Sequence, residues 1–323
     1  GDQSRHFNQI MSPLARLLDW LSIKYGVLFI VSAGNHSSPI KLRVSTNEFK
    51  ELENRNLEEE VVKAIFQEIR NRKLLSPSES INSLTIGSVH KDNSELKHQP
   101  NKIDIFNRLL PSPLSALGLG YRKSIKPDLV YYGGRVLFEN PIINQENVQL
   151  KTVAYRSAPG NKVAAPDSKG EINKTMYTSG TSNAAALISR AGVYCYDTLR
   201  NLFNSQLAYI EPDNYYPLLI KAILVHGSEW GEIADNLTNI FSDAGNRRDI
   251  KNYISKWIGN GYPDIERILY CTKNRVTLIG YGDLDDGEAH LYRLPLPPSF
   301  ASKKEWRRIS ATLAWFSPIS AST

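Results

Sequence analysis

A run of consecutive apolar residues near the N-terminus constrains the fold of this chain most. Residues 27–31 are Val-Leu-Phe-Ile-Val, and Ser32, Ala33, Gly34 and Asn35 follow at once. A strand that is apolar at every position and rich in β-branched residues is typical of a parallel sheet whose two faces are both covered by helices. Ligands of such sheets bind beyond the carboxyl ends of the strands. The run therefore predicts an α/β fold with Asn35 at a strand end where a ligand can bind.

Helical periodicity flanks this strand in the sequence. Apolar residues recur at helical spacing over 14–25 and stop at Gly26, a residue type that commonly ends helices in the left-handed conformation. An amphipathic surface helix is predicted over about 57–72, and a helix rich in small residues from Ser182 to about Phe203. Further short strands are predicted at 84–89 and 128–131. Together these elements favour a parallel sheet flanked by helices.

Composition excludes several classes of protein. Of the 323 residues, 41% are hydrophobic and 22% are charged, and no apolar run approaches the roughly 20 residues of a membrane-spanning helix. The formal net charge of +6 is not concentrated in one block, so we expect neither nucleic acid nor a membrane as partner. Cys195 and Cys271 lack the spacing of a disulfide framework or a zinc site, which favours a cytoplasmic over a secreted location. The acidic stretch 283–288 lacks the spacing of a calcium loop, and we expect no metal and no cofactor.

Ser182 lies where nucleophiles often lie, in the first turn of a helix made of small residues. Gly180, two residues earlier, allows other backbone to approach closely. The helix N-terminus supplies backbone N–H groups and a positive partial charge, which stabilise negative charge on an attacked carbonyl group. The alternative is structural, because the hydroxyl of Thr181 or Ser182 can simply cap the helix.

Asn35 also has two interpretations. Its side-chain amide can donate a hydrogen bond to an oxyanion at the end of the buried strand. Alternatively it is a turn residue, since Asn tolerates left-handed backbone better than most residues. Neither Asn35 nor Ser182 decides the function alone.

Four segments, in the order of the chain, resemble those of one known family. One of them is residues 86–89, Ile-Gly-Ser-Val, which resembles a strand of that family. Residues 31–35, Val-Ser-Ala-Gly-Asn, resemble the oxyanion-hole segment of the subtilisin-like serine proteases, the subtilases. Residues 180–186, Gly-Thr-Ser-Asn-Ala-Ala-Ala, are similar to their nucleophile segment Gly-Thr-Ser-x-Ala-x-Pro, although Asn183 stands where Met is common and Ala186 where Pro is usual. Residues 125–130, Ile-Lys-Pro-Asp-Leu-Val, resemble the Lys-Pro-Asp stretch between them.

The resemblance implies a function and a site. Ser182 would be the nucleophile of a serine endopeptidase, which hydrolyses peptide bonds through an acyl-enzyme. The Asn35 side chain and the Ser182 backbone N–H would bind the oxyanion of a peptide or protein substrate. Residues 32–34 would line the primary specificity pocket and pair with an extended peptide as an added strand. The implied substrate-binding residues are Ser32, Ala33, Gly34, Gly180 and Thr181.

The resemblance also implies residues that this chain lacks. Subtilases carry an Asp in Asp-Ser/Thr-Gly and a His in His-Gly-Thr-His well before the oxyanion asparagine, so both are expected upstream of Gly1. His36 lacks the His-Gly context, and His226 follows Ser182 instead of preceding it. The chain alone is therefore expected to be inactive, as a part of a full-length protease. The alternative is a catalytically dead subtilase fold that serves as a scaffold or binding module.

Three regions are expected along the chain. Residues 1–240 would form a subtilisin-like catalytic domain that is incomplete at its N-terminus, and 241–274 would connect it to a partial β-sandwich-like domain over 275–323. Strands of that last domain are predicted at 276–281, 290–294 and 309–316. Residues 158–174 are predicted to be loop, because turn-forming residues dominate them.

Overall fold

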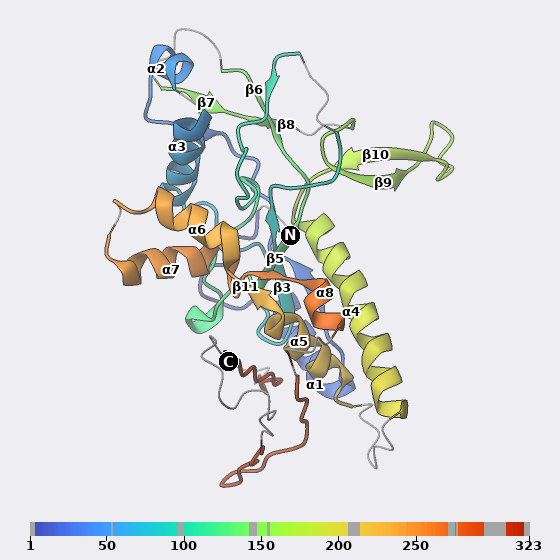
Figure 1. The fold of residues 1–323 in the computed structure, drawn as a ribbon. Coiled ribbons are helices and arrows are strands. Elements are labelled where there is room, and N and C mark those ends of the chain that lie inside the picture. Colours follow the sequence, from blue (N-terminus) through green and yellow to red (C-terminus); the bar gives the residue numbers. More distant parts are fainter. Residues whose placement is uncertain are drawn as a thin grey trace.

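A parallel sheet of three strands lies at the centre of the computed structural model, with helices on both sides (Figure 1). Its strands are β1 (Ile30–Ser32), β3 (Leu84–Val89) and β5 (Leu129–Tyr132), in the spatial order β1-β3-β5. The structure describes residues 4–52, 54–95, 100–141, 147–153, 156–205, 214–243, 245–270, 275, 277–293 and 308–319. The predicted α/β fold with a parallel sheet flanked by helices is confirmed.

Helix α4 (Thr181–Ser205) covers one face of this sheet and contacts all three strands. The sheet turns Leu84 and Ile86 of β3 toward the helix, as the alternation of side chains along a strand requires. The helix packs small and branched residues against them, including Ala184 and Ile188, which are fully buried. Small residues allow a close approach between helix and sheet, which explains the alanine-rich start of α4. Helices α5 (Tyr216–His226) and α8 (Ile265–Leu269) pack beside α4 on this side.

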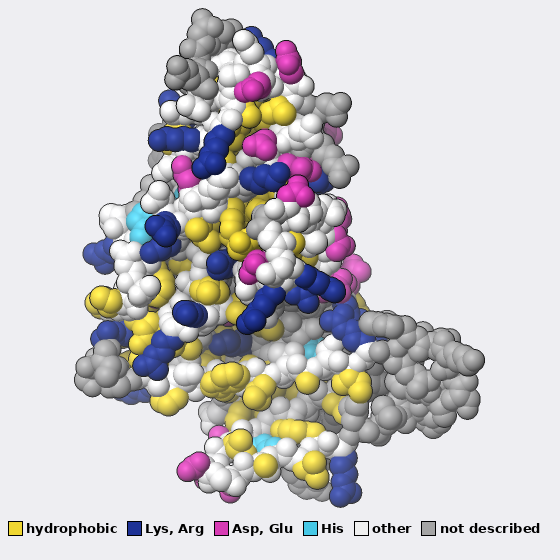
Figure 2. All heavy atoms as spheres, turned by 90° about the vertical axis from the view of Figure 1, so that its left-hand side faces the viewer, with side chains coloured by type: hydrophobic (Ala, Val, Ile, Leu, Met, Phe, Trp, Pro, Cys, Tyr) yellow, Lys and Arg dark blue, Asp and Glu magenta, His cyan; other side chains and the backbone are white. Residues whose placement is uncertain are grey.

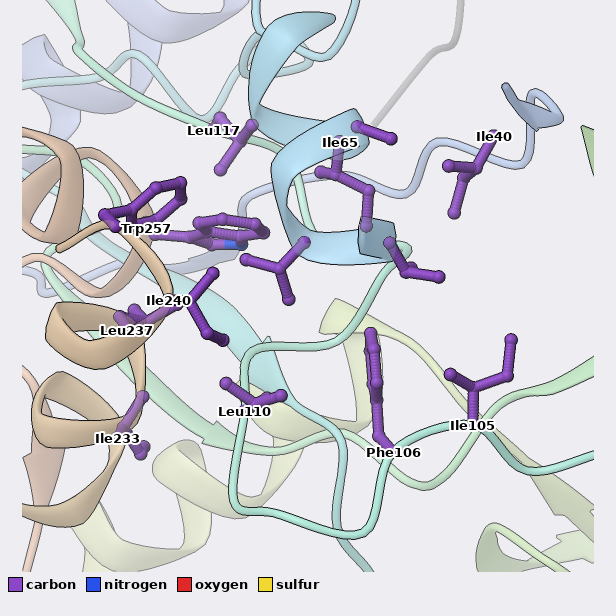
Figure 3. Packing of buried hydrophobic residues seen from close by; sticks show 14 of the residues in the cluster. Ile40, Ile65, Ile105, Phe106, Leu110, Leu117, Ile233, Leu237, Ile240 and Trp257 are labelled. Carbon is purple, nitrogen blue, oxygen red and sulfur yellow. The ribbon is translucent and has the colours of Figure 1, made fainter. Parts of the chain in front are cut away.

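The opposite face of the sheet borders a larger core, part of which is shown in Figure 3. It is built by α3 (Asn54–Gln67), α6 (Gly231–Ile240) and α7 (Arg247–Ile258). The Trp257 side chain on α7 is completely buried there, and truncating such a residue costs about 3–5 kcal/mol. Residues 241–274 are predicted to be a connection, but α7 is an integral part of this core.

The surface over α3, α6 and α7 carries mixed charge. Figure 2 shows Lys and Arg side chains spread over this face, with Asp and Glu beside them and apolar side chains between. The face has no block of one sign, in keeping with the scattered charge of the sequence.

Helix α1 (Pro13–Tyr25) precedes β1 and has the predicted end. The Ser12 hydroxyl accepts a hydrogen bond from the Ala15 N–H, so it caps the first turn. Gly26 follows the helix with φ +57°, the left-handed conformation that glycine adopts without strain.

Short strands and turns make up the rest of the described fold. The antiparallel hairpin of β9 (Asn161–Ala165) and β10 (Lys174–Thr178) projects from the body of the molecule (Figure 1). The remaining elements are β2 (Ile40–Lys41), α2 (Thr46–Glu51), β4 (Lys102–Ile103), η1 (Tyr121–Lys123), β6 (Leu137–Glu139), β7 (Gln149–Leu150), β8 (Thr152–Val153), β11 (Ser228–Glu229) and β12 (Tyr262–Pro263).

Several predicted boundaries differ from the structure. Strand β1 begins at Ile30 rather than at residue 27, and the helix predicted over 57–72 ends at Gln67. The loop predicted over 158–174 contains strand β9 and the first residue of β10. These two strands pair as an antiparallel hairpin, so only the turn between them matches the predicted loop.

The predicted C-terminal strands are not formed in the described residues 277–293 and 308–319, which contain neither helix nor strand. Large side chains such as Leu291 and Leu313 are more than 80% exposed there. A strand needs a neighbouring strand to pair with, and no described strand pairs with these segments. Residues 276 and 294, at the ends of two predicted strands, lie outside the described residues.

Candidate active site

The end of β1 and the start of α4 meet at the carboxyl edge of the sheet. Gly34, just beyond the strand, has φ +111°, and a Cβ atom there would lie 2.6 Å from the Leu75 side chain. Only glycine fits this position. Its backbone N–H donates to the Thr181 hydroxyl at 3.2 Å, which joins the strand end to the helix start.

Asn35 caps helix α4 from a segment 146 residues earlier in the sequence. The backbone N–H of Thr181 donates to Asn35 Oδ1 at 2.9 Å, and the Thr181 hydroxyl donates to the same oxygen at 3.0 Å. The first helical N–H is one of the groups that a helix leaves without an internal partner, so this bond stabilises the helix. Asn35 is therefore not only a turn residue, and Thr181, which is fully buried, is part of the connection.

These two bonds fix the orientation of the Asn35 amide. Because Oδ1 accepts both of them, rotating the amide would place its NH2 group against two donors. The Nδ2 atom is held next to Gly180, only 2.7 Å from where a Cβ on that residue would be. Gly180 has φ +141° and its N–H donates to Gly133 O at 2.8 Å. This position in the nucleophile segment accepts only glycine.

Ser182 is exposed, in contrast to its buried neighbour Thr181. Within the described part of the chain, no residue forms a hydrogen bond with its hydroxyl or accepts one from its backbone N–H. Ser182 therefore does not cap the helix, which is the structural role that its sequence position allows. Its N–H lies in the first turn of α4, where the helix dipole favours negative charge.

Asn183 has a structural task at this position. Its side-chain amide donates to Thr178 O at 2.9 Å and to Gly133 O at 3.3 Å. The Asn183 oxygen accepts from the Thr178 hydroxyl at 3.1 Å. These bonds tie the helix start to the end of β10 and to the residues after β5.

Residues 32–34 have a narrower role than predicted. The Ala33 N–H donates to Ile86 O at 2.9 Å, and the Gly34 N–H is taken by Thr181. Both carbonyl groups accept bonds from neighbouring loops. The backbone N–H and C=O groups of Ala33 and Gly34 are thus paired within the fold, so these two residues have no free N–H group with which to add a peptide strand.

Three histidines that could serve as a base are engaged elsewhere. The His36 ring bonds through Nε2 to Lys73 O at 2.7 Å, and burial, with Arg72 and His6 nearby, lowers its pKa to about 4 despite that bond. The His226 ring bonds to the Thr312 hydroxyl at 3.0 Å, and burial lowers its pKa.

The third, His90, follows β3 directly. Its Nε2 bonds to Asp104 Oδ1 at 2.9 Å and its Nδ1 accepts from the Val136 N–H at 3.3 Å. Its side chain has no exposed surface. Both ring nitrogens are thus occupied, so His90 is a structural residue. No sequence motif marks His90 or Asp104, because they lie 14 positions apart in a loop-rich stretch.

Cys195 faces the sheet from α4 and is buried, and burial raises the pKa of its thiol to about 11. It is a packed thiol within the core beside the sheet. Cys271 lies outside the described residues. Across the described ranges, no three His, Cys, Asp or Glu side chains are grouped so as to hold a metal ion. None of the described helices is both long and apolar enough to cross a bilayer.

A comparison with protein families places the chain in a family. The family model described as the subtilase family matches residues 4–252, more than three quarters of the chain. The chain belongs to the subtilase family. The matched range includes both the Asn35 segment and the Ser182 segment.

A longer relative of this subtilase is known from Sinorhizobium fredii (strain NBRC 101917 / NGR234). The chain is 25% identical over 323 residues to the uncharacterized protein y4bN of that organism. The similar stretch covers 99% of this chain and 66% of the relative, so the chain spans about two thirds of the relative's length. No solved structure matches the chain.

Proposed function

We propose that the chain is the part of a serine endopeptidase that carries the nucleophile and the groups that bind the oxyanion. Ser182 is the nucleophile, and the Asn35 amide and the Ser182 backbone N–H bind the oxyanion. The observation that carries the proposal is the bond between Asn35 Oδ1 and the Thr181 N–H at 2.9 Å, one residue before Ser182. It holds a side-chain amide beside an exposed serine hydroxyl at a helix N-terminus.

The proposed reaction begins when Ser182 Oγ attacks the carbonyl carbon of a peptide bond. The hydroxyl proton passes to a base as the tetrahedral intermediate forms, and the carbonyl oxygen becomes an oxyanion. Asn35 Nδ2 and the Ser182 N–H donate to that oxygen, and the dipole of α4 adds to the stabilisation. The amine leaves with a proton from the same base, and water then hydrolyses the acyl-enzyme.

Among the described residues, no histidine ring forms a hydrogen bond with the Ser182 hydroxyl. His36, His90 and His226 are each held by other groups, so none takes the Ser182 proton in the described geometry. A histidine and an orienting aspartate in a segment before Gly1 would complete the site, as the sequence of the family implies. The 323-residue chain alone is then expected to be essentially inactive, because losing the base of such a triad costs about 10⁶-fold in kcat.

Hydrolysis of an unfolded protein substrate tests the proposal. The protein is expressed with the residues encoded before Gly1, and cleavage of casein is compared for the unsubstituted protein and for Ser182→Ala. Cleavage that disappears in Ser182→Ala supports the proposal. Cleavage that persists in the variant contradicts Ser182 as the nucleophile.

The second candidate is a catalytically dead subtilase fold that acts as a scaffold or binding module. The commitment of all three histidines to other partners favours it. Absence of casein cleavage by the longer protein, together with an upstream sequence that contains no Asp-Ser/Thr-Gly and no His-Gly-Thr-His, would establish it over the protease.

A further inference from the structure

A polar cavity lies against His36, close in the chain to Asn35. Its volume is about 390 Å³, within the range of about 300–1,000 Å³ common for ligand sites. His36, the next residue after Asn35, forms one wall, and His6 and Arg70 come from two other parts of the chain. Asn and Ser side chains complete the lining, which contains no Asp or Glu.

Positive charge surrounds this cavity. Arg70 lines it and is exposed, so its guanidinium can turn toward a bound group. Arg72 lies behind the wall, where it donates to Ser38 O at 3.0 Å, and Lys73 Nζ reaches Asn8 Oδ1 at 3.5 Å. One carboxylate, Glu68, approaches this group, 4.0 Å from Arg72 Nε. Three cations against one anion leave the cavity wall net positive.

The two histidines add hydrogen-bonding capacity inside the cavity. Their rings stack with centroids 5.2 Å apart, and His36 is 5% exposed. His6 Nδ1 is buried and has no hydrogen-bond partner in the described part of the chain. A buried polar atom without a partner is costly, so an incoming polar group that bonds to it is favoured.

The position of the cavity determines which part of a peptide can enter it. Consecutive Cα atoms are 3.8 Å apart, so the wall at His36 begins one residue from the amide that would hold the oxyanion. The His36 N–H donates to Leu114 O at 2.8 Å, which fixes the wall in place. For a peptide bound with its carbonyl oxygen at that amide, the side chain nearest to this wall would be the one on the residue that supplies the carbonyl.

We propose that the cavity lined by His6, His36 and Arg70 selects an acidic side chain, aspartate or glutamate, on the residue that supplies the scissile carbonyl. The register of the peptide rests on the proposed protease function, whereas the preference for a carboxylate rests on the cavity itself. Charge-assisted hydrogen bonds from a guanidinium to a carboxylate are about twice as strong as neutral ones, which gives the preference its physical basis.

Binding of matched peptides to the 323-residue chain tests the charge preference without requiring catalysis. Two acetylated tetrapeptide amides are compared that differ only in glutamate or glutamine at the last position, and their dissociation constants are measured by calorimetry. The glutamate peptide is expected to bind about tenfold more tightly, a difference of about 1.4 kcal/mol. Arg70→Gln should remove most of this difference and Arg70→Lys should keep part of it.

Arg190→Gln provides the matched control, because Arg190 is an exposed arginine on α4 whose Nε bonds to Tyr194. It should leave the glutamate preference unchanged. Equal affinities for the two peptides, no measurable binding of the glutamate peptide, or a preference that survives Arg70→Gln would overturn the proposal. None of these readouts needs Ser182 to react. Failure of the charge preference is therefore distinguished from failure of the casein assay.

Discussion

Two neighbouring strands of the same sheet end in polar residues, yet the two strand ends differ in what they leave available. Beyond β1, Asn35 and Thr181 bond to each other and leave Ser182 exposed. Beyond β3, His90 and Asp104 form a bonded pair of the residue types that a triad uses, but both ring nitrogens of His90 are occupied. The presence of a histidine and an aspartate therefore does not by itself make the end of β3 a reactive site. The site is where the fold leaves a polar group accessible.

The largest effect is expected from Asn35→Asp, which separates the two tasks of Asn35. A carboxylate at this position still accepts from the Thr181 N–H and suits a helix N-terminus, so stability should change by less than about 1 kcal/mol. It has no N–H2 to donate to the oxyanion, so hydrolysis by the longer protein should fall about 10²- to 10³-fold. Chemical denaturation and casein cleavage give the two readouts.

Asn35→Leu serves as the contrast, since it removes the acceptor as well as the donor and should also destabilise the fold by about 1–2 kcal/mol. Full activity in Asn35→Asp would show that the amide does not contact the oxyanion.

Gly180→Ala should damage the Asn35–Ser182 region through packing. Its Cβ would lie 2.7 Å from Asn35 Nδ2, at a φ of +141° that side chains rarely adopt. We expect a loss of about 1–3 kcal/mol in the free energy of unfolding. Gly170→Ala is the matched control, because Gly170 also has a positive φ but no atom lies within 4 Å of its Cβ position. Equal losses in both variants would mean that backbone strain alone, and not contact with Asn35, is responsible.

His90→Gln should affect stability and leave the chemistry of Ser182 alone. It disturbs a buried pair with Asp104, at a cost of about 1–3 kcal/mol measured by denaturation. The rate of casein cleavage by the folded longer protein should stay within about twofold of the original. A collapse of activity in folded His90→Gln protein would show that the strand end after β3 takes part in catalysis.

The last prediction concerns pH and His36. Its pKa in the folded protein is about 4, below the ordinary 6.5, because burial disfavours the charged ring. The unfolded chain therefore binds the proton more readily, and the His36 contribution to stability is complete above pH 6.5 and is lost as the pH falls toward 4. The Tm of the unsubstituted chain should decline over this interval more steeply than that of His36→Gln. Parallel curves of Tm against pH for the two proteins would contradict the lowered pKa of His36.

The sequence predicts the parts of this fold that depend on local patterns. The buried β3, the glycine end of α1 and the start of α4 follow from runs of apolar residues, glycine and small residues that lie close together in the chain. The identities of Asn35 and Ser182 as candidate residues follow from short motifs of the same kind.

Long-range contacts could not be predicted in this way. The bond from Thr181 to Asn35 joins residues 146 positions apart, and no spacing rule indicates that the asparagine oxygen caps the helix. The same holds for Trp257, which enters the larger core from a stretch that is polar on average. The occupied backbone of Ala33 and Gly34 is likewise a consequence of tertiary pairing.

Labelling of Ser182 by a fluorophosphonate probe tests the central claim most directly, since the probe reacts only with an activated serine. The 323-residue chain and the longer protein are treated in parallel, and the adduct is located by peptide mass spectrometry. We expect an adduct on Ser182 in the longer protein and none on the 323-residue chain in the same time. An adduct on Ser182 of the 323-residue chain at a comparable rate would contradict the missing base.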